Sequence, residues 1–437
     1  MEFDKKEFKH IKEVLEEKKD DVFLRGWVYR LREQKELIFV SLRDVSGIIQ
    51  LVVDKNKVGD EIFSKAKILT IESSFMVCGK LRKEERSPQG YEIDVEDLEI
   101  VGVSEKYPIS KDFSEEYLLD VRHLWLRSRK MISIMKIRDT VFSAIHSYFK
   151  KQGFYLYHSP VLQSVQCEGG SILFKVNYFE KPGVFLAQTW QLYAEPAIMA
   201  LEKIYTISPS FRAEKSKTSR HLTEYWHAEM EAAWIDFKEL QDHGEFLLKE
   251  ILKEVLDKNK EELKILKRDT KILKSSLEKS FVRMTYTKAL EILKEKCDLD
   301  IEWGKDLRTI EEDKLSKLHD TFVIITHYPK QVKAFYMKED KDDSKVVLGF
   351  DCIAPEGYGE IIGASERESD LEKIKERLLE QGEDPSQYEF YLDTRRYGSV
   401  PHGGFGLGVE RVISFICGLS TIKDAIAFPR TMVRYKP

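Results

Sequence analysis

Cysteine is scarce in this sequence, and the few cysteines do not cluster. Among 437 residues there are five, widely separated at positions 78, 167, 297, 352 and 417. No CxxC pair or Cys/His cluster marks a structural zinc site, so we expect no zinc. An odd, scattered set indicates reduced thiols, which is typical of a cytoplasmic protein.

Long apolar runs are also missing. The opening segment MEFDKKEFKHIKEVLEEKKD is charged throughout and has no apolar signal core. No run approaches the roughly 18 apolar residues that a membrane span needs. We therefore expect a cytoplasmic protein that does not contact a membrane.

An excess of positive charge is absent as well. Lys and Arg number 71 against 76 Asp and Glu, for a net charge of -5. This balance excludes a protein that holds nucleic acid by bulk charge, but local basic patches remain compatible with RNA binding. With 42% hydrophobic residues the chain can bury a sizeable core, and its length allows two domains.

Short alternating segments fill the first hundred residues, after an amphipathic helix expected within residues 1–20. The run VFLRGWVYRLREQKELIFVSLRDVSGIIQLVV predicts successive strands, with Gly26 and Gly47 as bulge or turn points. SSFMVCGKLRK and GYEIDVEDLEIVG add two more strands. We predict a small five-stranded barrel of the OB type over residues 1–103.

The pattern changes after a charged linker, predicted as a hinge over residues 104–129. Over residues 130–437 a helical stripe ends near Gly153, and strand-like pieces follow: FYLYHSPVL, VFLAQTWQLYA, KIYTISPSFRAE, YWHAEMEAAW, FVIITHYP, VVLGFDCIA and FGLGVERV. The segment from Phe237 to Lys296 should be mainly helical. The predicted class is therefore α+β, a barrel followed by an antiparallel sheet flanked by helices.

Polar residues alternate in the stretch WQLYAEP. If this is a strand, Gln191, Tyr193 and Glu195 share one face, which is unusual in a core and normal in a pocket wall. A lone carboxylate there would repel an acid and accept an amine or an amide.

Residues 211–234, FRAEKSKTSRHLTEYWHAEMEAAW, combine paired charges with a basic loop. Arg212 and Glu214 are two apart, as are Glu229 and Glu231, so each pair shares a strand face. The intervening loop KSKTSRH suits a polyphosphate, because Arg and Lys bind phosphate oxygens. A hairpin with a solvated, charged tip is the alternative.

Two later stretches carry glycines and carboxylates. In PHGGFGLGVERVISFICGL, glycines 404, 406 and 408 alternate and leave one strand face bare for a flat ring, and Arg411 follows where a helix begins. In CIAPEGYGEIIGASERE, Glu360 could hold Mg²⁺ beside a polyphosphate, and Arg367 could bind a carboxylate or a carbonyl oxygen. A tight strand-to-helix turn and a surface charge cluster are the alternatives.

Together these motifs resemble the archaeal-type asparaginyl-tRNA synthetases, class II enzymes of the aspartyl, asparaginyl and lysyl subgroup. FYLYHSPVL resembles motif 1, FRAE…RHLTEY motif 2, and GFGLGVER motif 3, in the family's order. The resemblance covers nearly the whole chain and implies a class II catalytic domain behind an anticodon-binding OB barrel. It also implies a homodimer, with ATP, asparagine and tRNA(Asn) as partners and Mg²⁺ as cofactor.

The resemblance assigns residues to the site. Catalysis falls to Arg212, Arg411 and Glu360, with Glu360 as the metal ligand. ATP binding adds Glu214, Arg220, His221, Leu222, Tyr225 and Gly408. Amino-acid binding falls to Glu168, Gln188, Gln191, Glu195, Arg212, Glu229, Gly363 and Arg367. Anticodon binding falls to Arg25, Phe39 and Gln50.

The choice of asparagine over aspartate depends on the segment after Tyr193. Aspartyl enzymes carry a lysine next, where this chain has Ala194, and asparaginyl enzymes carry the glutamate found here as Glu195. Glu195 would accept a hydrogen bond from the amide while Arg367 donates to its oxygen. Trp190 departs from the small or polar residue that the family usually shows.

Two alternatives stay open. One is an aspartyl-tRNA synthetase with relaxed tRNA specificity. The other is a paralogue that no longer aminoacylates and acts as an amide-forming synthetase or an RNA-binding regulator.

Overall fold

The computed structural model describes residues 3, 7–87, 89–109, 113–167, 173–215 and 220–436. The chain divides into two compact units, Met1–Ser114 and Glu115–Pro437. Glu168, assigned above to amino-acid binding, lies outside the described residues. Among the helices described, none combines the length and apolar character needed to cross a membrane.

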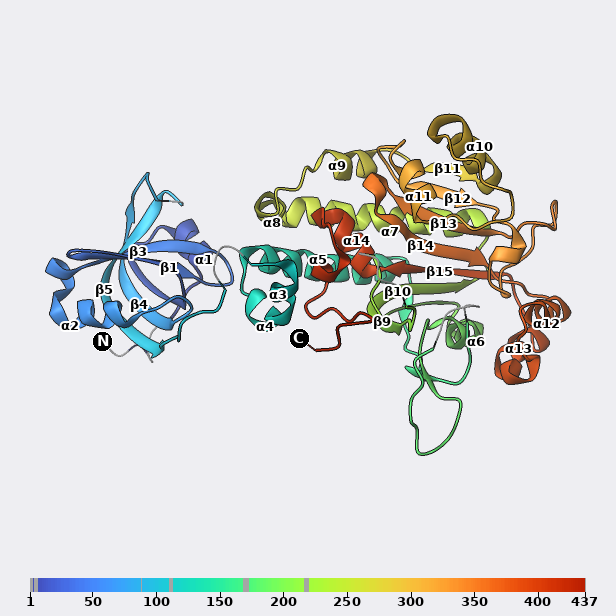
Figure 1. Ribbon diagram of the computed structural model, residues 1–437, viewed down its shortest axis with the longest axis horizontal. Coiled ribbons are helices and arrows are strands. Elements are labelled where there is room, and N and C mark those ends of the chain that lie inside the picture. The colour runs from blue at the N-terminus through green and yellow to red at the C-terminus, as the bar shows by residue number, and fades with distance from the viewer. Residues whose placement is uncertain are drawn as a thin grey trace. The chain divides into compact units, whose positions relative to one another are not determined.

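The smaller unit is a closed five-stranded barrel with strand order β1-β2-β3-β5-β4, which confirms the predicted OB-type fold (Figure 1). Its elements are α1 (Ile11–Glu17), β1 (Asp21–Gln34), β2 (Leu37–Arg43), β3 (Ile48–Asp54), α2 (Lys55–Ile68), β4 (Ser74–Lys83) and β5 (Tyr91–Gly102). Strand residues alternate between a buried apolar interior and an outer surface, as in Val40 inward and Phe39 outward on β2.

The two predicted glycine positions behave differently. A side chain at Gly26 would collide with the Arg43 carbonyl on the neighbouring strand, so glycine allows a close strand approach there. The register shift of β1 falls between Val28 and Arg30 instead. Gly47 closes a turn in which its amide donates to the Asp44 carboxylate.

The larger unit holds the remaining elements. Its helices are α3 (Glu115–Asp120), α4 (Arg122–Trp125), α5 (Arg129–Lys151), α6 (Gln191–Leu201), α7 (Phe237–Lys258), α8 (Lys260–Ile265), α9 (Lys271–Glu278), α10 (Tyr286–Cys297), α11 (Thr309–Ser316), α12 (Leu371–Glu380), α13 (Glu389–Arg396) and α14 (Val409–Cys417), with short 3₁₀ turns η2 (Lys330–Val332), η3 (Pro355–Gly357), η4 (Pro385–Tyr388) and η5 (Ile422–Ala425). Its strands are β6 (Tyr155–Leu156), β7 (Leu162–Gln163), β8 (Phe185–Leu186), β9 (Lys203–Phe211), β10 (Glu224–Ala233), β11 (Val282–Thr285), β12 (Val323–Thr326), β13 (Gly349–Ala354), β14 (Gly359–Glu366) and β15 (His402–Gly408).

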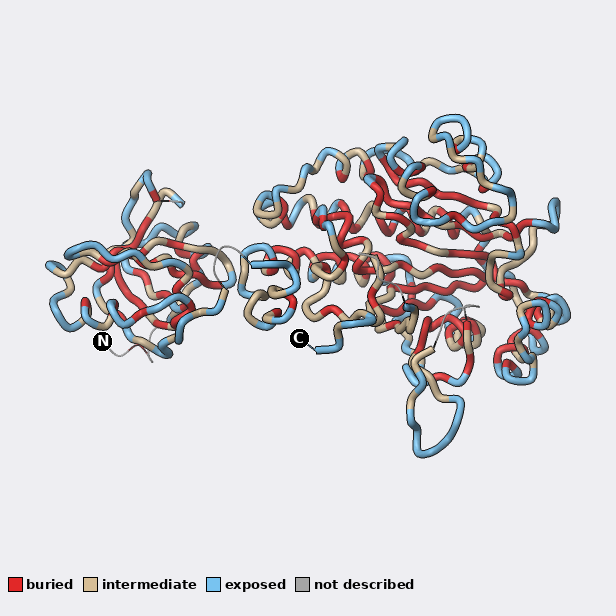
Figure 2. Tube along the Cα trace, viewed as in Figure 1, coloured by how far each residue is buried: buried red, intermediate tan, exposed pale blue. Residues whose placement is uncertain are grey.

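Eight strands form one mainly antiparallel sheet in the order β11-β12-β13-β14-β15-β10-β9-β6, and β7 pairs with β8. Helices α5, α7 and α14 share one large hydrophobic core with this sheet, so the predicted sheet with flanking helices is confirmed. The long helices start where side chains satisfy exposed amides: Ser128 caps α5, and Asp236 with Glu239 forms a capping box on α7. Figure 2 shows the sheet strands as the buried centre of this unit.

Strand alternation separates the core face of the sheet from its polar face. On β10, Ala228 and Met230 belong to the hydrophobic core, whereas Glu229 and Glu231 between them line a pocket on the other side. On β15, Phe405 belongs to the core and the glycines beside it face β10 side chains. The polar face therefore carries the candidate site.

The stretch WQLYAEP is not a strand, and that prediction was wrong. Strand β8 ends at Leu186, and the stretch forms the start of helix α6. The Tyr193 and Ala194 amides donate to the Trp190 carbonyl in the first helical turn. Gln191 and Glu195 still share a face, because residues four apart are neighbours on a helix, and Tyr193 points elsewhere and packs on the Phe390 ring.

Candidate functional site

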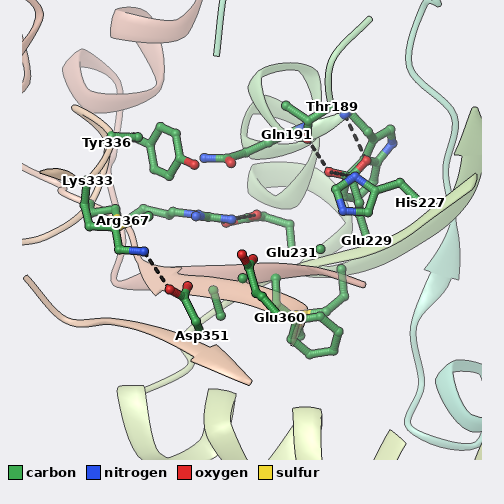
Figure 3. Close-up of a pocket in the computed structure, with 18 of the residues that line it drawn as sticks. Thr189, Gln191, His227, Glu229, Glu231, Lys333, Tyr336, Asp351, Glu360 and Arg367 are labelled. Carbon is green, nitrogen blue, oxygen red and sulfur yellow. Dashed lines mark hydrogen bonds and ion pairs between the residues drawn. The ribbon is translucent and has the colours of Figure 1, made fainter. Parts of the chain in front are cut away.

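A pocket of about 600 Å³ opens on the polar face of the large sheet (Figure 3). A loop around η2 covers one side of it and the start of α6 the other. Its lining includes six residues assigned from the sequence, namely Gln191, Arg212, Glu229, Glu360, Gly363 and Arg367.

One end of the pocket is built on a buried ion pair. Arg367, directly after β14, donates two hydrogen bonds to the Glu231 carboxylate, at 3.0 Å from Nε and 2.9 Å from Nη2. The guanidinium lies over the Tyr336 ring, with its carbon 5.0 Å from the ring centroid. Figure 3 shows Arg367 facing Glu231, so this end presents a neutral, hydrogen-bonding pair rather than a single charge.

Glu195 is completely buried beside this pair. It receives Arg395 Nη2 at 2.6 Å, His402 Nε2 at 3.0 Å and Gln191 Nε2 at 2.9 Å, while Arg367 Nε lies 3.9 Å away. Burial alone would raise the pKa of Glu195, but Arg395 and then His402 outweigh burial and leave the pKa lowered. Among the described residues, Glu195 is not one of those that line the pocket.

Glu195, Glu231 and His402 place three ligand-type atoms within 4.8 Å of one another. Arg367 and Arg395 bond to the same two carboxylates and neutralise them. The chemistry of this cluster is therefore that of a salt-bridge network, in which guanidinium groups take the place that a cation would need.

A second carboxylate on β10 is held by the start of α6. The Trp190 amide donates to Glu229 Oε2 at 3.0 Å, and the Thr189 hydroxyl donates to the other oxygen. Figure 3 shows Thr189 beside Glu229. His227 Nδ1 lies 3.6 Å from the same carboxylate. Glu229 is thus anchored in the pocket with one defined orientation.

A further group of carboxylates lies around β13 and β14. A methyl group placed at Gly363 would lie 2.9 Å from Glu360 Oε1 and 3.9 Å from Asp351 Oδ1, so both carboxylates converge above this glycine. Lys333 Nζ lies 2.7 Å from Asp351, and the two side chains are each 13% exposed. Burial, partly offset by Lys333 and reinforced by Glu360, raises the pKa of Asp351 to about 6. Burial and then Glu360 raise the pKa of Glu312 to about 7.

These raised pKa values mark a site with more negative charge than its own cations balance. Convergent carboxylate oxygens are the ligands that Mg²⁺ prefers, together with a substrate's phosphate oxygens. The donor set around Glu360 therefore fits a hard divalent cation.

A second, smaller pocket adjoins the first and shares Arg212, His227, Glu360 and Gly406 with it. Its lining adds further assigned residues, namely Arg220, His221, Leu222, Tyr225, Gly408 and Arg411, and Glu214 lies with Arg212 in a third small pocket alongside. Arg411 is fixed by a 2.5 Å hydrogen bond from Nη1 to the Glu360 carbonyl, and Arg220 pairs with Asp313.

The electrostatics of this second pocket are positive. Burial and then the Arg411 charge hold the pKa of His221 below its usual value. The Arg212 guanidinium carbon lies 5.8 Å from the Tyr225 ring centroid. Half-buried cations around an aromatic ring suit a nucleotide polyphosphate.

The alternating glycines serve a different purpose from the one predicted. A side chain at Gly404 would collide with Glu231, and one at Gly406 with the His227 ring. Those two glycines therefore make room for β10 side chains rather than for a ligand. At Gly408 a methyl group would meet only Arg411 carbons, 3.8 Å away or more, so space for a flat ring remains at that position.

On the barrel, Phe39 and Gln50 lie on adjacent strands of the outer surface. Ser41, two residues from Phe39, pairs with Gln50, whose side-chain amide donates to Glu92 at 2.7 Å. Arg32 pairs with Phe39 across β1 and β2, and its guanidinium lies 4.7 Å from the Phe39 ring centroid.

Arg25 is not brought to that surface. It pairs with Met76 on β4, stacks on Phe8 and lines a separate pocket with Trp27. The seven-residue separation along β1 places it well away from the strand pairs that hold Phe39.

The structure therefore gathers most assigned residues and leaves a few apart. Gln188 and Glu195 are buried without lining the pocket among the described residues. Reasoning from sequence missed Glu231, Lys333 and Asp351, which do line it. Glu231 could have been found, since strand alternation pairs it with Glu229, whereas the positions of Lys333 and Asp351 depend on how distant segments pack.

Comparisons with known proteins agree with this geometry. The model of the class II tRNA synthetases (D, K and N) matches residues 114–432, and that of the OB-fold nucleic acid binding domain matches residues 22–101. The chain is 46% identical to an asparagine–tRNA ligase of Pyrococcus furiosus over 98% of both chains, and 45% identical to that of Thermoplasma acidophilum over 95% of this chain and 96% of the relative. Its fold is similar to a crystal structure of asparaginyl-tRNA synthetase from Pyrococcus horikoshii complexed with asparaginyl-adenylate, with a TM-score of 0.95, 45% identity, and 99% and 100% of the two chains covered.

Proposed function

Because the chain belongs to the class II tRNA synthetases, among the asparagine–tRNA ligases, we propose that it attaches asparagine to tRNA(Asn) with ATP. The reaction passes through an asparaginyl-adenylate and releases pyrophosphate and then AMP. The observation that carries the proposal is the buried Arg367–Glu231 pair at one end of a pocket whose other end opens onto a cationic nucleotide site.

The pair suits an amide side chain. An amide offers one acceptor oxygen and two N–H donors, so Arg367 can donate to the oxygen while Glu231 accepts from the nitrogen. Aspartate would bring a second anion against Glu231 and offer no donor. Leaving that charge unpaired in a closed pocket costs several kcal/mol, and rejection by polar mismatch can exceed a thousandfold.

Glu195 acts on the amide indirectly in this proposal. Its carboxylate holds the Gln191 side chain, which lines the pocket, and lies 3.9 Å from Arg367. The amide contact assigned to Glu195 from the sequence thus passes to Glu231. Glu195 keeps a role in selection because it fixes the groups that do make contact.

Activation of asparagine requires attack of its carboxylate on the α-phosphorus of ATP. Arg212 lies where the two pockets meet and can neutralise the α-phosphate, and Arg411 can bind the γ-phosphate. Glu229 suits the α-amino group, and the adenine has room between Tyr225 and Gly408. Positioning and charge neutralisation carry the rate, since little proton transfer is needed.

We assign the Mg²⁺ that accompanies ATP to Glu360, with Asp351 beside it. The ion would neutralise phosphate charge during transfer. Lys333 balances part of the local negative charge and holds the Asp351 carboxylate in place.

The barrel reads the anticodon in this proposal. Phe39 stacks on one anticodon base and Gln50 hydrogen-bonds to another, the combination that OB-folds use for unpaired RNA bases. Arg32, over the Phe39 ring, is better placed than Arg25 to contact the same nucleotides.

We also propose that the protein is a cytoplasmic homodimer. Large apolar side chains are exposed around the motif 1 segment, on the loop over residues 173–184, at the end of α6 and directly after β10: Tyr155, Leu156, Val161, Leu162, Tyr178, Phe179, Leu201 and Trp234. Such a concentration marks a protein–protein interface. Sedimentation equilibrium should give a mass near twice 51.2 kDa, and a monomer at micromolar concentration would contradict the proposal.

ATP–pyrophosphate exchange with asparagine and aspartate side by side tests the function. Asparagine should drive exchange and aspartate should not, followed by charging of tRNA(Asn). Exchange with aspartate alone would indicate the aspartyl enzyme, and exchange with neither would indicate a non-aminoacylating paralogue.

A further inference from the structure

Trp190 is the residue that ties the amino-acid pocket to the motif 1 segment. It precedes helix α6, it is 2% exposed, and part of it lines the pocket beside Thr189 and Gln191. Its neighbours come from three elements: Ala194 and Ile198 on α6, Ile204 on β9 and Ala233 on β10.

The indole makes one polar contact at the far side of this cluster. Trp190 Nε1 donates to the Tyr157 carbonyl at 3.1 Å, and the two rings meet edge to face with centroids 6.1 Å apart. Tyr157 directly follows β6, the edge strand of the large sheet. The hydrogen bond therefore fixes the orientation of the indole ring, and the surrounding cluster keeps the ring buried.

The backbone of the same residue faces the pocket. The Trp190 amide donates to Glu229 Oε2, and Thr189 donates its hydroxyl to the other oxygen. Thr189 also receives the Gln191 amide at 3.2 Å, which joins these donors to the first turn of α6. The indole donor and the two groups that orient Glu229 therefore belong to the same two residues, Thr189 and Trp190.

We propose that Trp190 is a positioning residue for the amino acid, acting through the Glu229 carboxylate. Its Nε1–H bond to Tyr157 locks the start of α6 against β6, and the locked segment presents two donors that hold Glu229 toward the α-amino group. The inference rests on the proposed function, because it is expressed in the binding of the amino acid. It predicts a defect in one substrate's binding rather than a general loss of folded protein.

The test replaces Trp190 by Phe, which keeps a ring and removes the N–H donor. Exchange kinetics should show a KM for asparagine raised about fivefold, which corresponds to the net free energy of one neutral hydrogen bond. The KM for ATP should stay within about twofold and kcat should change little, since ATP phosphate contacts are untouched. Trp303→Phe is the matched control, because Trp303 also donates its indole N–H, to Thr287 at 3.2 Å, and does not line the pocket.

A purely structural role would give a different result. Equal changes in both KM values, or a lowered melting temperature with an unchanged KM for asparagine, would overturn the proposal. If Trp190→Phe folds poorly, benzothienylalanine at position 190 keeps the two-ring shape without the N–H and should raise the KM for asparagine alone. Thr189→Val combined with Trp190→Phe should be non-additive, because both changes act through Glu229.

The wild-type assay separates this inference from the proposed function. If aspartate rather than asparagine drives exchange, the function is wrong, yet the KM for aspartate in Trp190→Phe still tests the positioning role. If neither amino acid drives exchange, calorimetric binding of asparaginyl-sulfamoyl adenosine to wild type and variant supplies the comparison, and equal affinities would overturn the role.

Discussion

The two ends of the catalytic groove carry charge in opposite ways. At the amino-acid end, Arg367, Glu231 and Glu195 are 5%, 1% and 0% exposed and pair with one another or with neighbouring side chains. At the nucleotide end, Arg212, Arg220 and Arg411 are half-buried and line a pocket that also holds Glu360 and Glu410. The amino-acid end is paired internally, whereas the nucleotide end collects cations that we propose bind phosphate.

The difference follows from the ligands. A neutral amide is recognised here by charged side chains in a closed pocket. Because unpaired buried charges are costly, the protein supplies a counter-ion for each of them and fixes their geometry. ATP brings its own negative charge, and cations that bind it cost little while they remain partly exposed to water. Substitutions at the first end should therefore affect folding and selectivity, and those at the second should affect rate without affecting folding.

Arg212→Ala should have the largest effect and leaves the fold intact. Loss of the cation at the α-phosphate should reduce asparagine-dependent exchange about a thousandfold. The melting temperature should change by no more than about 2 °C, because the side chain is half-buried. A large loss of thermal stability, measured by calorimetry, would show that Arg212 supports the fold as much as the buried charges of the amino-acid end do.

Glu195→Gln should act mainly on stability. It leaves Arg395 and His402 facing a neutral group in a fully buried site, at an expected cost of about 3 kcal/mol in the free energy of unfolding. Unfolding in guanidinium chloride measures both variants. Glu214→Gln, half-buried at the nucleotide end, should cost less than about 0.5 kcal/mol in the same measurement.

The difference in unfolding free energy between wild type and Glu195→Gln should depend on pH, with a definite sign. Because the pKa of Glu195 is lowered in the folded protein, its contribution is fully present above the unfolded pKa and is lost as pH falls toward the folded pKa. The gap between wild type and Glu195→Gln should be constant from about pH 6 to 8 and shrink below about pH 4. A gap that grows on acidification would contradict the assignment of Glu195 as a paired carboxylate.

Two residues on one face of β10 show what the sequence could and could not specify. Alternation placed Glu229 and Glu231 together, but only the structure shows that Glu231 pairs with Arg367 and Glu229 with the start of α6, the difference on which their proposed roles depend. The strand prediction for WQLYAEP failed for a related reason. Positions four apart share a face in both a strand and a helix, so Gln191 and Glu195 fitted either period.

The strand register of the barrel shows a similar limit of prediction from sequence. Composition and alternation were enough to predict its five strands, and Phe39 and Gln50 do lie on adjacent strands of its outer surface. The irregular pairing between Val28 and Arg30 cannot be read from the sequence, and it decides that Arg32 rather than Leu31 lies across from Phe39.

Glu231→Gln should reduce selectivity more than activity. Removing the anion that repels a substrate carboxylate should lower the ratio of kcat/KM for asparagine over aspartate about a hundredfold. Glu229→Gln, on the same strand face, should raise KM for both amino acids and leave the ratio unchanged, because the α-amino group is common to both. If the ratio falls in Glu229→Gln instead, the two carboxylates have been assigned the wrong way round.

Phe39→Ala should have the smallest of these effects and should leave both ends of the groove unchanged. Loss of one stacking surface should raise KM for tRNA in the charging assay about tenfold, within the range measured for single base–aromatic contacts. Exchange with asparagine and ATP should be unaffected, since Phe39 belongs to the barrel and not to the catalytic unit. Arg25→Ala, on a separate surface of the same barrel, should change charging less than Phe39→Ala does. A larger effect of Arg25→Ala would move the anticodon site to the Trp27 pocket, whereas loss of exchange in Phe39→Ala would show that the barrel and the catalytic groove are energetically coupled.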